Sequence, residues 1–310
     1  MRDLIEGILR GDHRTIARAI TLIENDRRKA QKIIRGIYTH TGNALVIGMT
    51  GAPGTGKSCL VDGLAGMYRK KEKKVGIIAV DPSSPFSGGA ILGDRIRMMR
   101  HSADPGIFIR SMATRGNLGG LAASTGETLS VLDAAGMDIV FIETVGVGQD
   151  EVDVVKFADI VCLVLIPGAG DDIQVFKAGI MEIADAFVLN KTDLAGSEKT
   201  EMQLRSVLEM ASEIGSPVPL VKTSADRGEG IEHLAEIIEE KATVIRSEDG
   251  KFQKKRWVSW MLREIIKEKL WRSVFAKIPE AEIEAGAERI RLKKTDPYSV
   301  AEELIKRWDK

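Results

Sequence analysis

Hydrophobic residues follow two different periods along the chain, and the two periods alternate. Seven short apolar runs lie between residues 44 and 224, and between them apolar residues recur every three or four positions, as on one face of a helix. The runs are ALVIGMT, VGIIAVD, IFIRSM, DIVFIE, IVCLVLI, AFVLN and PLVKTS. Short runs rich in β-branched residues, separated by helical segments, predict an α/β fold with a mainly parallel sheet covered by helices on both faces.

The regions before and after this alternation have a helical pattern only. At the start of the chain, isoleucines recur at helical spacing among many charged residues, so amphipathic helices are expected. Near the end, Asp296 followed by Pro297 predicts a helix start. We expect an N-terminal helical extension over 1–43, an α/β domain over 44–247 and a helical tail over 248–310. The tail carries an apolar ladder with a spacing of four: Val258, Leu262, Ile266, Leu270 and Val274.

Charge and cysteine content exclude several classes of function. The 310 residues include 45 basic and 45 acidic side chains, so no net charge attracts the chain to nucleic acid or to an anionic membrane. Only Cys59 and Cys162 are present, without zinc-ligand spacing, which fits a reducing compartment. No apolar run reaches the roughly 18 residues of a membrane span. We expect a soluble, cytoplasmic protein with no nucleic acid and no membrane partner.

The most specific chemical signal follows the first apolar run. The segment GAPGTGKS opens a helical pattern, and its glycines let backbone N–H groups point at phosphate oxygens, next to the positive end of the helix. Lys57 can then reach the β- and γ-phosphates, and the hydroxyl of Ser58 can bind Mg²⁺. The predicted phosphate-binding residues are Gly51, Ala52, Pro53, Gly54, Thr55, Gly56, Lys57, Ser58 and Cys59.

Two later segments indicate which base is bound. AFVLNKTD places Asn190, Lys191 and Asp193 after a predicted strand, and KTSAD places Ser224 and Ala225 after the next one. The carboxylate of Asp193 can accept two hydrogen bonds from guanine N1–H and its exocyclic amine. Adenine has no proton on N1 and would leave the carboxylate without these donors, at a cost of roughly 1–3 kcal/mol. The sequence therefore favours GTP and GDP over adenine nucleotides.

Carboxylates at strand ends are the candidates for a magnesium site. Asp81 ends the second apolar run, Asp94 lies in the polar loop that follows, and Glu143 ends the fourth run. Carboxylate oxygens above a phosphate loop can bind Mg²⁺ directly or through its waters. Together with Ser58, these three residues are the predicted metal ligands.

Five segments together resemble one family, the methylmalonyl-CoA mutase-associated GTPases (MeaB family). They are VDPSSPFSGGAILGDRIRM, FIRSMATRG, FIETVGVGQ, PGAGDDIQVFKAGIMEIAD and NKTD. The resemblance covers nearly the whole chain. It implies a P-loop GTPase of the class that includes the signal recognition particle GTPases, with an extra strand that IFIRSM fits. It also implies a homodimer that acts as a chaperone for an adenosylcobalamin-dependent mutase and gates cofactor loading and protection.

The resemblance also assigns residues. It makes residues 81–97 the first switch, with Asp94 in its functional acidic position, and 143–146 the second switch. Residues 167–179 match a third switch that contacts the mutase, where Asp171, Asp172 and Lys177 are the predicted partner residues. Cys59 departs from the family, which commonly has Thr there, and Arg110, Thr114 and Arg115 match it without a firm role. The predicted catalytic residues are Lys57, Asp94, Glu143 and Gly146.

The second switch predicts slow hydrolysis by the isolated protein. In Ras-like GTPases a Gln after the switch glycine orients the attacking water, but here that position is Val147, and the nearest amide is Gln149. An apolar side chain cannot hold a water. We expect low intrinsic turnover that rises when the mutase docks.

Three alternatives remain from the sequence. A GTP-binding regulatory module with little turnover would share every binding motif. A metal-insertion GTPase would need soft or imidazole ligands, yet no Cys-x-x-Cys is present and the four histidines are scattered. A transport-linked ATP-dependent kinase would need adenine binding, against which NKTD argues.

The tail is the expected dimerisation element. Its apolar ladder is larger than one helix usually needs, and aromatic anchors are typical of interfaces. The alternative is that the tail packs on its own nucleotide domain. All tryptophans of the chain lie in the tail: Trp257, Trp260, Trp271 and Trp308.

Overall fold

The computed structural model describes most of the chain in two compact units, Met1–Ser247 and Glu248–Lys310. The residues described are 1–81, 103–113, 120–144, 157–168, 184–212, 218–246, 258, 262–263, 265–267, 269–271, 273–275 and 277–308. None of the helices in these ranges combines the length and the apolar content that crossing a membrane requires.

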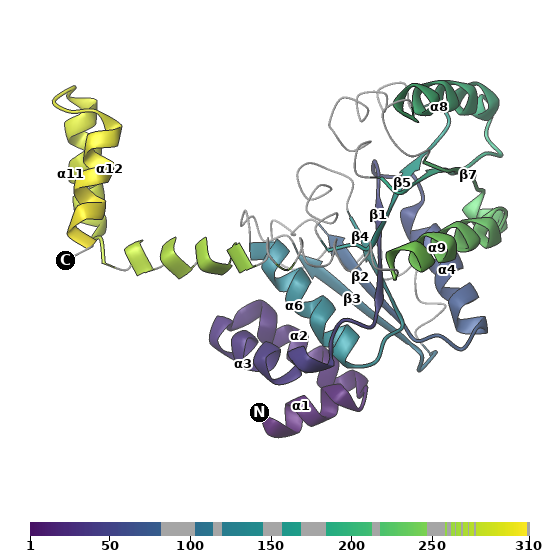
Figure 1. Cartoon of the computed structure of the whole chain (residues 1–310), viewed down its shortest axis with the longest axis horizontal. Coiled ribbons are helices and arrows are strands. Elements are labelled where there is room, and N and C mark those ends of the chain that lie inside the picture. The colour runs from purple at the N-terminus through teal and green to yellow at the C-terminus, as the bar shows by residue number, and fades with distance from the viewer. Residues whose placement is uncertain are drawn as a thin grey trace. The chain divides into compact units, whose positions relative to one another are not determined.

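The first unit is built on one seven-stranded sheet in which every neighbouring pair of strands is parallel. The strand order is β3-β2-β4-β1-β5-β6-β7 (Figure 1). Each of the seven apolar runs forms one strand, so the predicted α/β fold class is confirmed. The strands are β1 (Leu45–Thr50), β2 (Val75–Asp81), β3 (Ile107–Ala113), β4 (Ile139–Glu143), β5 (Ile160–Leu165), β6 (Ala186–Leu189) and β7 (Leu220–Lys222).

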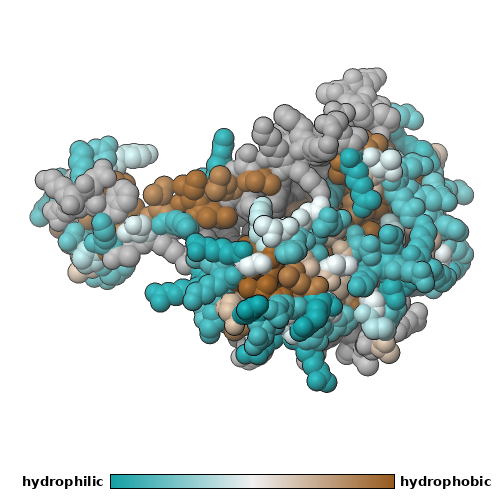
Figure 2. Space-filling view, turned by 60° about the horizontal axis from the view of Figure 1, so that its bottom comes forward, coloured by the Kyte–Doolittle hydropathy of each residue, from teal (hydrophilic) through white to brown (hydrophobic). Residues whose placement is uncertain are grey.

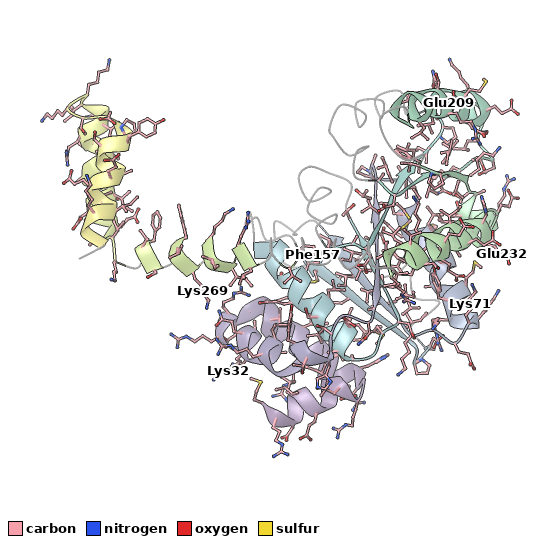
Figure 3. All side chains as sticks on the ribbon, in the orientation of Figure 1. Lys32, Lys71, Phe157, Glu209, Glu232 and Lys269 are labelled. Atoms are coloured by element: carbon pink, nitrogen blue, oxygen red, sulfur yellow. The ribbon has the colours of Figure 1, made fainter. Side chains whose placement is uncertain are left out.

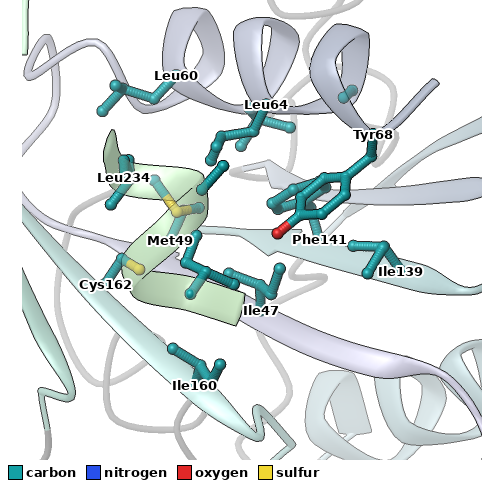
Figure 4. Close-up of a cluster of buried hydrophobic side chains, with 14 of the residues drawn as sticks. Ile47, Met49, Leu60, Leu64, Tyr68, Ile139, Phe141, Ile160, Cys162 and Leu234 are labelled. Atoms are coloured by element: carbon teal, nitrogen blue, oxygen red, sulfur yellow. The ribbon is translucent and has the colours of Figure 1, made fainter. Parts of the chain in front are cut away.

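One face of the sheet is covered by α4 (Lys57–Lys70) and α9 (Ile231–Ile245), which contact each other. Their apolar sides meet the central strands in a single buried cluster that includes Leu60, Phe141 and Leu234 (Figure 4). Because parallel strands are covered on both faces, β1, β4 and β5 are buried along their whole length. This packing fixes the carboxyl ends of the central strands, where the predicted site residues lie.

The other face is covered by the N-terminal helices and α6 (Gly120–Ala134). The N-terminal helices are α1 (Arg2–Leu9), α2 (His13–Asn25) and α3 (Arg27–Ile37), followed by the one-turn helix η1 (Tyr38–His40). The ribbons of these helices lie beside α6 (Figure 1), and their apolar sides form a second buried cluster with α6 and with β1, β2 and β4. Arg110 of β3 also pairs with Glu24, and Arg27 pairs with Glu127 of α6. The N-terminal helices therefore contribute to the core of the first unit.

Two further features complete the first unit. The helix α8 (Ser197–Ser212) buries Leu204 against β5 and β6 in a third cluster. A side-chain carbon added at Gly126 of α6 would lie 2.8 Å from the ring of Phe157, so the ring packs directly on the helix backbone (Figure 3). Apolar contacts therefore hold α8 against the sheet and Phe157 against α6.

Three strands begin directly after an aspartate that fastens the neighbouring strand. The backbone N–H of Asp159 donates to the carbonyl oxygen of Val46 at 2.8 Å, and the N–H of Val46 donates back to Asp159 Oδ2 at 2.9 Å. This closed pair of bonds satisfies strand ends that the ladder leaves open. It recurs between Asp138 and Lys74 and between Asp185 and Val161. We call Asp138, Asp159 and Asp185 the strand-start aspartates.

The described part of the second unit is mainly helical. Its two complete helices are α11 (Glu280–Arg291) and α12 (Pro297–Trp308), which contact each other. The carboxylate of Asp296 accepts from the N–H groups of Tyr298 and Ser299 at 2.9 and 3.0 Å, which caps α12 at the predicted start. The described residues between 258 and 275 are helical as well, and hydrophobic side chains gather along them (Figure 2).

Candidate nucleotide site

The predicted phosphate loop connects the end of β1 to the start of α4. Gly56 precedes the helix with a φ of +91°, and a side-chain carbon there would lie 2.4 Å from Asn190 Nδ2. Gly51 has a φ of +141°, and a side-chain carbon there would lie 2.2 Å from the carbonyl oxygen of Val164. Both positions therefore require glycine. The loop leads into the amino end of α4, where the first-turn N–H groups and the helix dipole favour an anion.

Lys57 and Thr55 shape the inside of this loop. The ammonium group of Lys57 donates to the carbonyl oxygens of Gly51 and Ala52 at 2.7 and 3.0 Å, and only 5% of the residue is exposed. The hydroxyl of Thr55 donates to the same Ala52 oxygen at 2.9 Å. A cation thus lies inside a loop of backbone dipoles, as binding of a polyphosphate requires.

The candidate magnesium ligands Ser58 and Glu143 lie in direct contact. The Ser58 hydroxyl donates to Glu143 Oε1 at 2.5 Å, and each residue is 5% exposed. Glu143 reaches this position because β4 lies between β1 and β2, with Glu143 opposite Met49 and Ala79. A hydroxyl and a carboxylate are hard oxygen donors that fit Mg²⁺. The part of the chain that the structure describes has no group of three or more His, Cys, Asp or Glu residues that could hold a metal by themselves.

Asn190 connects the phosphate loop to both base segments. Its Nδ2 donates to the carbonyl oxygen of Thr55 at 2.8 Å. Its Oδ1 accepts from the Thr223 hydroxyl at 3.0 Å and from the Ala225 N–H at 3.1 Å. The residue is 1% exposed, so these bonds form in a buried environment where loss of one partner is costly. Segments about 135 positions apart in the chain are joined by one amide group.

Lys191 and Asp193 occupy the edge of the same site. Lys191 has a φ of +58° and its ammonium group donates to the Gly54 carbonyl at 2.8 Å, so its stem crosses the region beside the phosphate loop. The Ser224 hydroxyl donates to Asp193 Oδ1 at 2.8 Å. That bond is the main reason why the pKa of Asp193 lies below its ordinary value of 3.8. Asp193 is therefore ionised at neutral pH and can accept hydrogen bonds from a base.

The structure brings together the phosphate loop, Ser58, Glu143 and the two base segments. Asp81 is the last residue of β2, the strand beside β4, and Cys59 is a half-buried residue in the first turn of α4. Arg110, which matched the family pattern without a role, contacts α2 through Glu24 and Thr21. The remaining predicted residues lie outside the described ranges: Asp94, Gly146, Val147, Gln149, Asp171, Asp172, Lys177, Thr114 and Arg115.

Two contacts at the base segments were not predicted. Thr223 precedes Ser224 in KTSAD, and its hydroxyl donates to Asn190 Oδ1. Arg227 follows two residues after Ala225, and its Nη2 lies 3.3 Å from Asp193 Oδ2. The only sequence signal for either residue is its position in KTSADRGEG, directly after the seventh strand.

A parallel sheet, a glycine-dependent phosphate loop and an NKTD segment whose asparagine bonds to that loop define a P-loop guanine nucleotide-binding protein. Residues 16–279 match the family described as "Methylmalonyl Co-A mutase-associated GTPase MeaB". The chain belongs to this family and is a GTPase.

Similar proteins cover three quarters of this chain or more. A Pyrococcus abyssi protein whose name describes it as a GTPase is 50% identical over 98% of this chain and 95% of its own length. A mouse protein named methylmalonic aciduria type A homolog, mitochondrial, is 34% identical over 76% of this chain and 62% of its own. A crystal structure described as a LAO/AO transport system kinase has a TM-score of 0.73 and 25% identity, and covers 100% of this chain and 97% of that one.

Proposed function

We propose that this protein binds GTP with Mg²⁺, hydrolyses it, and acts as a chaperone for an adenosylcobalamin-dependent acyl-CoA mutase, gating the loading and protection of its cofactor. The observation that carries the guanine nucleotide site is Asn190, whose amide joins the phosphate loop to both base segments. The family description, which names methylmalonyl-CoA mutase, supports the partner and favours that mutase among related acyl-CoA mutases.

The residues of the site have separate roles in this proposal. Asp193 accepts from guanine, and the stem of Lys191 lies along the base. Lys57 leaves the carbonyl groups of the loop and binds the β- and γ-phosphates, where it stabilises negative charge as water attacks the γ-phosphorus and GDP leaves. Mg²⁺, when bound, supplies positive charge to the phosphates. Ser58 and Glu143 would hold it, with Asp81 and Asp94 as further proposed ligands.

Control of hydrolysis is the second part of the proposal. Val147 stands where a water-orienting Gln is found in Ras-like enzymes, so the isolated protein hydrolyses GTP slowly. Contact of the mutase with the third switch, at Asp171, Asp172 and Lys177, would then trigger turnover. A slow GTP state gives the chaperone time to engage its partner. The same protein forms a homodimer through its helical tail.

Phosphate release measured with and without the mutase tests the proposal. With GTP and Mg²⁺ we expect slow release by the protein alone, and an increase of at least about tenfold with methylmalonyl-CoA mutase, within the range that an activating partner supplies. Lys57→Ala should release no phosphate in either case.

Two results would contradict different parts of this function. Equal competition by ATP and GTP for the site would remove the guanine assignment. Fast phosphate release that does not change when any acyl-CoA mutase is added would contradict the chaperone role, although the protein would still be a GTPase.

A further inference from the structure

The base-recognition carboxylate carries a second partner besides the Ser224 hydroxyl. Arg227 Nη2 lies 3.3 Å from Asp193 Oδ2, while Ser224 donates to Oδ1 at 2.8 Å. The two oxygens of Asp193 are therefore held from two directions. A carboxylate oxygen can accept more than one hydrogen bond, so both partners leave Asp193 able to receive donors from a base.

The backbone around Arg227 holds it in place. Arg227 ends the one-turn helix η5 (Ala225–Arg227), and its N–H donates to the Ser224 carbonyl at 3.0 Å. The turn is closed at its base, because Ser224 and Glu229 exchange backbone hydrogen bonds of 3.0 and 3.2 Å. Ala225 at the start of η5 is in turn bound to Asn190. The arginine thus extends from a short loop that is fastened to the site itself.

Charge and exposure distinguish Arg227 from a buried structural residue. Its side chain is 59% exposed, whereas that of Asp193 is 24% exposed. An exposed ion pair contributes little to folding stability. Arg227 also helps to lower the pKa of Asp193, after the larger effect of Ser224. An arginine that contributes little to stability but faces the base-reading carboxylate is placed to affect binding.

We propose that Arg227 is a specificity-determining residue of the base site, which fixes the plane of the Asp193 carboxylate so that both oxygens face guanine. This inference rests on the proposed binding of guanine nucleotides. Guanine donates to Asp193 through N1–H and its 2-amino group, whereas hypoxanthine, the base of inosine nucleotides, has N1–H only. Two donors require a fixed carboxylate plane, and one donor tolerates rotation. Arg227 therefore increases the preference for GDP over IDP.

Equilibrium titration of the full chain with GDP and IDP tests this role. Arg227→Gln should weaken GDP binding by up to about fivefold, the upper end for one exposed ion pair, and should weaken IDP binding less, so that the ratio of the two affinities falls. Arg227→Lys keeps the charge without the planar fork and should restore part of the ratio. The effect should shrink in 0.5 M NaCl, because an exposed pair is screened by salt.

A matched control is present in α8. Arg205 also forms an exposed ion pair, with Glu201 at 2.9 Å and a side chain that is 55% exposed, but it belongs to a helix that carries none of the site residues. Arg205→Gln should leave both affinities unchanged. In steady-state hydrolysis, Arg227→Gln should raise KM for GTP and leave kcat unchanged, as expected when binding of ground state and transition state is affected equally.

The outcomes separate this inference from the function on which it rests. A wild-type chain that binds neither GDP nor GTP would overturn the proposed function and the role of Arg227 with it. A wild-type chain that binds GDP, together with an Arg227→Gln variant that loses GDP and IDP affinity by the same factor or loses neither, would overturn the role of Arg227 alone. Equal loss of GDP and IDP affinity would indicate that Arg227 acts on the ribose or the phosphates, which the two nucleotides share.

Discussion

At the scale of single residues, one buried side-chain amide holds the phosphate loop and the two base segments together. Asn190 makes three hydrogen bonds to two segments, the phosphate loop and the loop that follows β7, and its amide supplies both the donor and the acceptor that these bonds require. An Asp at this position would lack the donor for the Thr55 carbonyl, and an Ala would leave Thr223 and two backbone groups without their partner. The asparagine of NKTD thus positions the loops, while Asp193 is the residue that we propose reads the base.

A second residue, Cys162, gives stability a pH dependence. It lies in β5, belongs to the cluster shown in Figure 4, and is fully buried. Burial raises the pKa of its thiol from 9.0 to about 12, with the charge of Asp185 adding to the effect. The folded chain therefore keeps a proton that the unfolded chain releases above pH 9. The free energy of unfolding must then fall as pH rises from about 9 towards 12.

Replacing Cys162 with Ala should make this alkaline loss of stability less steep. We expect the slope of unfolding free energy against pH to decrease by up to about 1.4 kcal/mol per pH unit above pH 9, measured by urea unfolding between pH 7 and 10.5. Val164→Ala, at a buried position in the same strand, removes apolar volume without a titrating group, so it should lower stability equally at every pH. Parallel curves for all three proteins would show that Cys162 does not titrate as argued.

At the scale of whole elements, the strand-start aspartates connect sequence to sheet order. Each follows a helix or loop and fastens the first residues of the adjacent strand with two hydrogen bonds. In a parallel sheet, neighbouring strands are not joined by a short hairpin turn. Their relative register must therefore be fixed by other contacts. Each aspartate carboxylate accepts a hydrogen bond from a backbone N–H at the start of the neighbouring strand. This bond fixes the register at the amino ends of the strands, whereas the nucleotide site lies at their carboxyl ends.

Asp159→Ala should destabilise the first unit by about 1–3 kcal/mol, because the N–H of Val46 loses its acceptor in a partly buried environment. Asp159→Asn retains an oxygen and should lose less. Glu232→Ala, at an exposed position on α9 (Figure 3), should change stability by less than about 0.5 kcal/mol. Urea midpoints at pH 7 would measure all three, and equal midpoints for Asp159→Ala and wild type would exclude a fastening role.

The elements could be predicted from sequence more completely than the contacts between them. The strands follow from short apolar runs and α12 follows from its Asp-Pro start, since these signals are local. The phosphate loop and NKTD were also visible, because glycine and carboxylate positions carry their chemistry directly. The pairing of Asp159 with Val46 and of Arg227 with Asp193 could not be predicted, because both join residues that only the fold brings together. Predicted residues outside the described ranges stay predictions.

At the scale of the whole molecule, the two compact units divide the work in our proposal. The unit Met1–Ser247 contains every described residue of the nucleotide site. Among the described residues of the unit Glu248–Lys310, Val300 is the only buried hydrophobic residue. Val258, Leu262, Ile266 and Leu270 of the apolar ladder are exposed, and a row of exposed apolar side chains is typical of an interaction surface. A chaperone that reports nucleotide state through a dimer would need such a separate contact region.

The tail therefore carries the last prediction, that it holds the homodimer together. Leu262 and Leu270, on the apolar ladder, are 55% and 50% exposed in one chain, and burying such side chains in a partner stabilises association by about 1.5–3 kcal/mol each. In the full-length protein, the double substitution Leu262→Glu with Leu270→Glu should convert the dimer into a monomer, as measured by light scattering. GDP affinity should stay unchanged. Lys267→Glu, a charge reversal at an exposed position of the same helical segment, should leave the dimer intact. A doubly substituted chain that remains dimeric would move the interface elsewhere, and a monomeric wild type would favour a tail that packs on its own nucleotide domain.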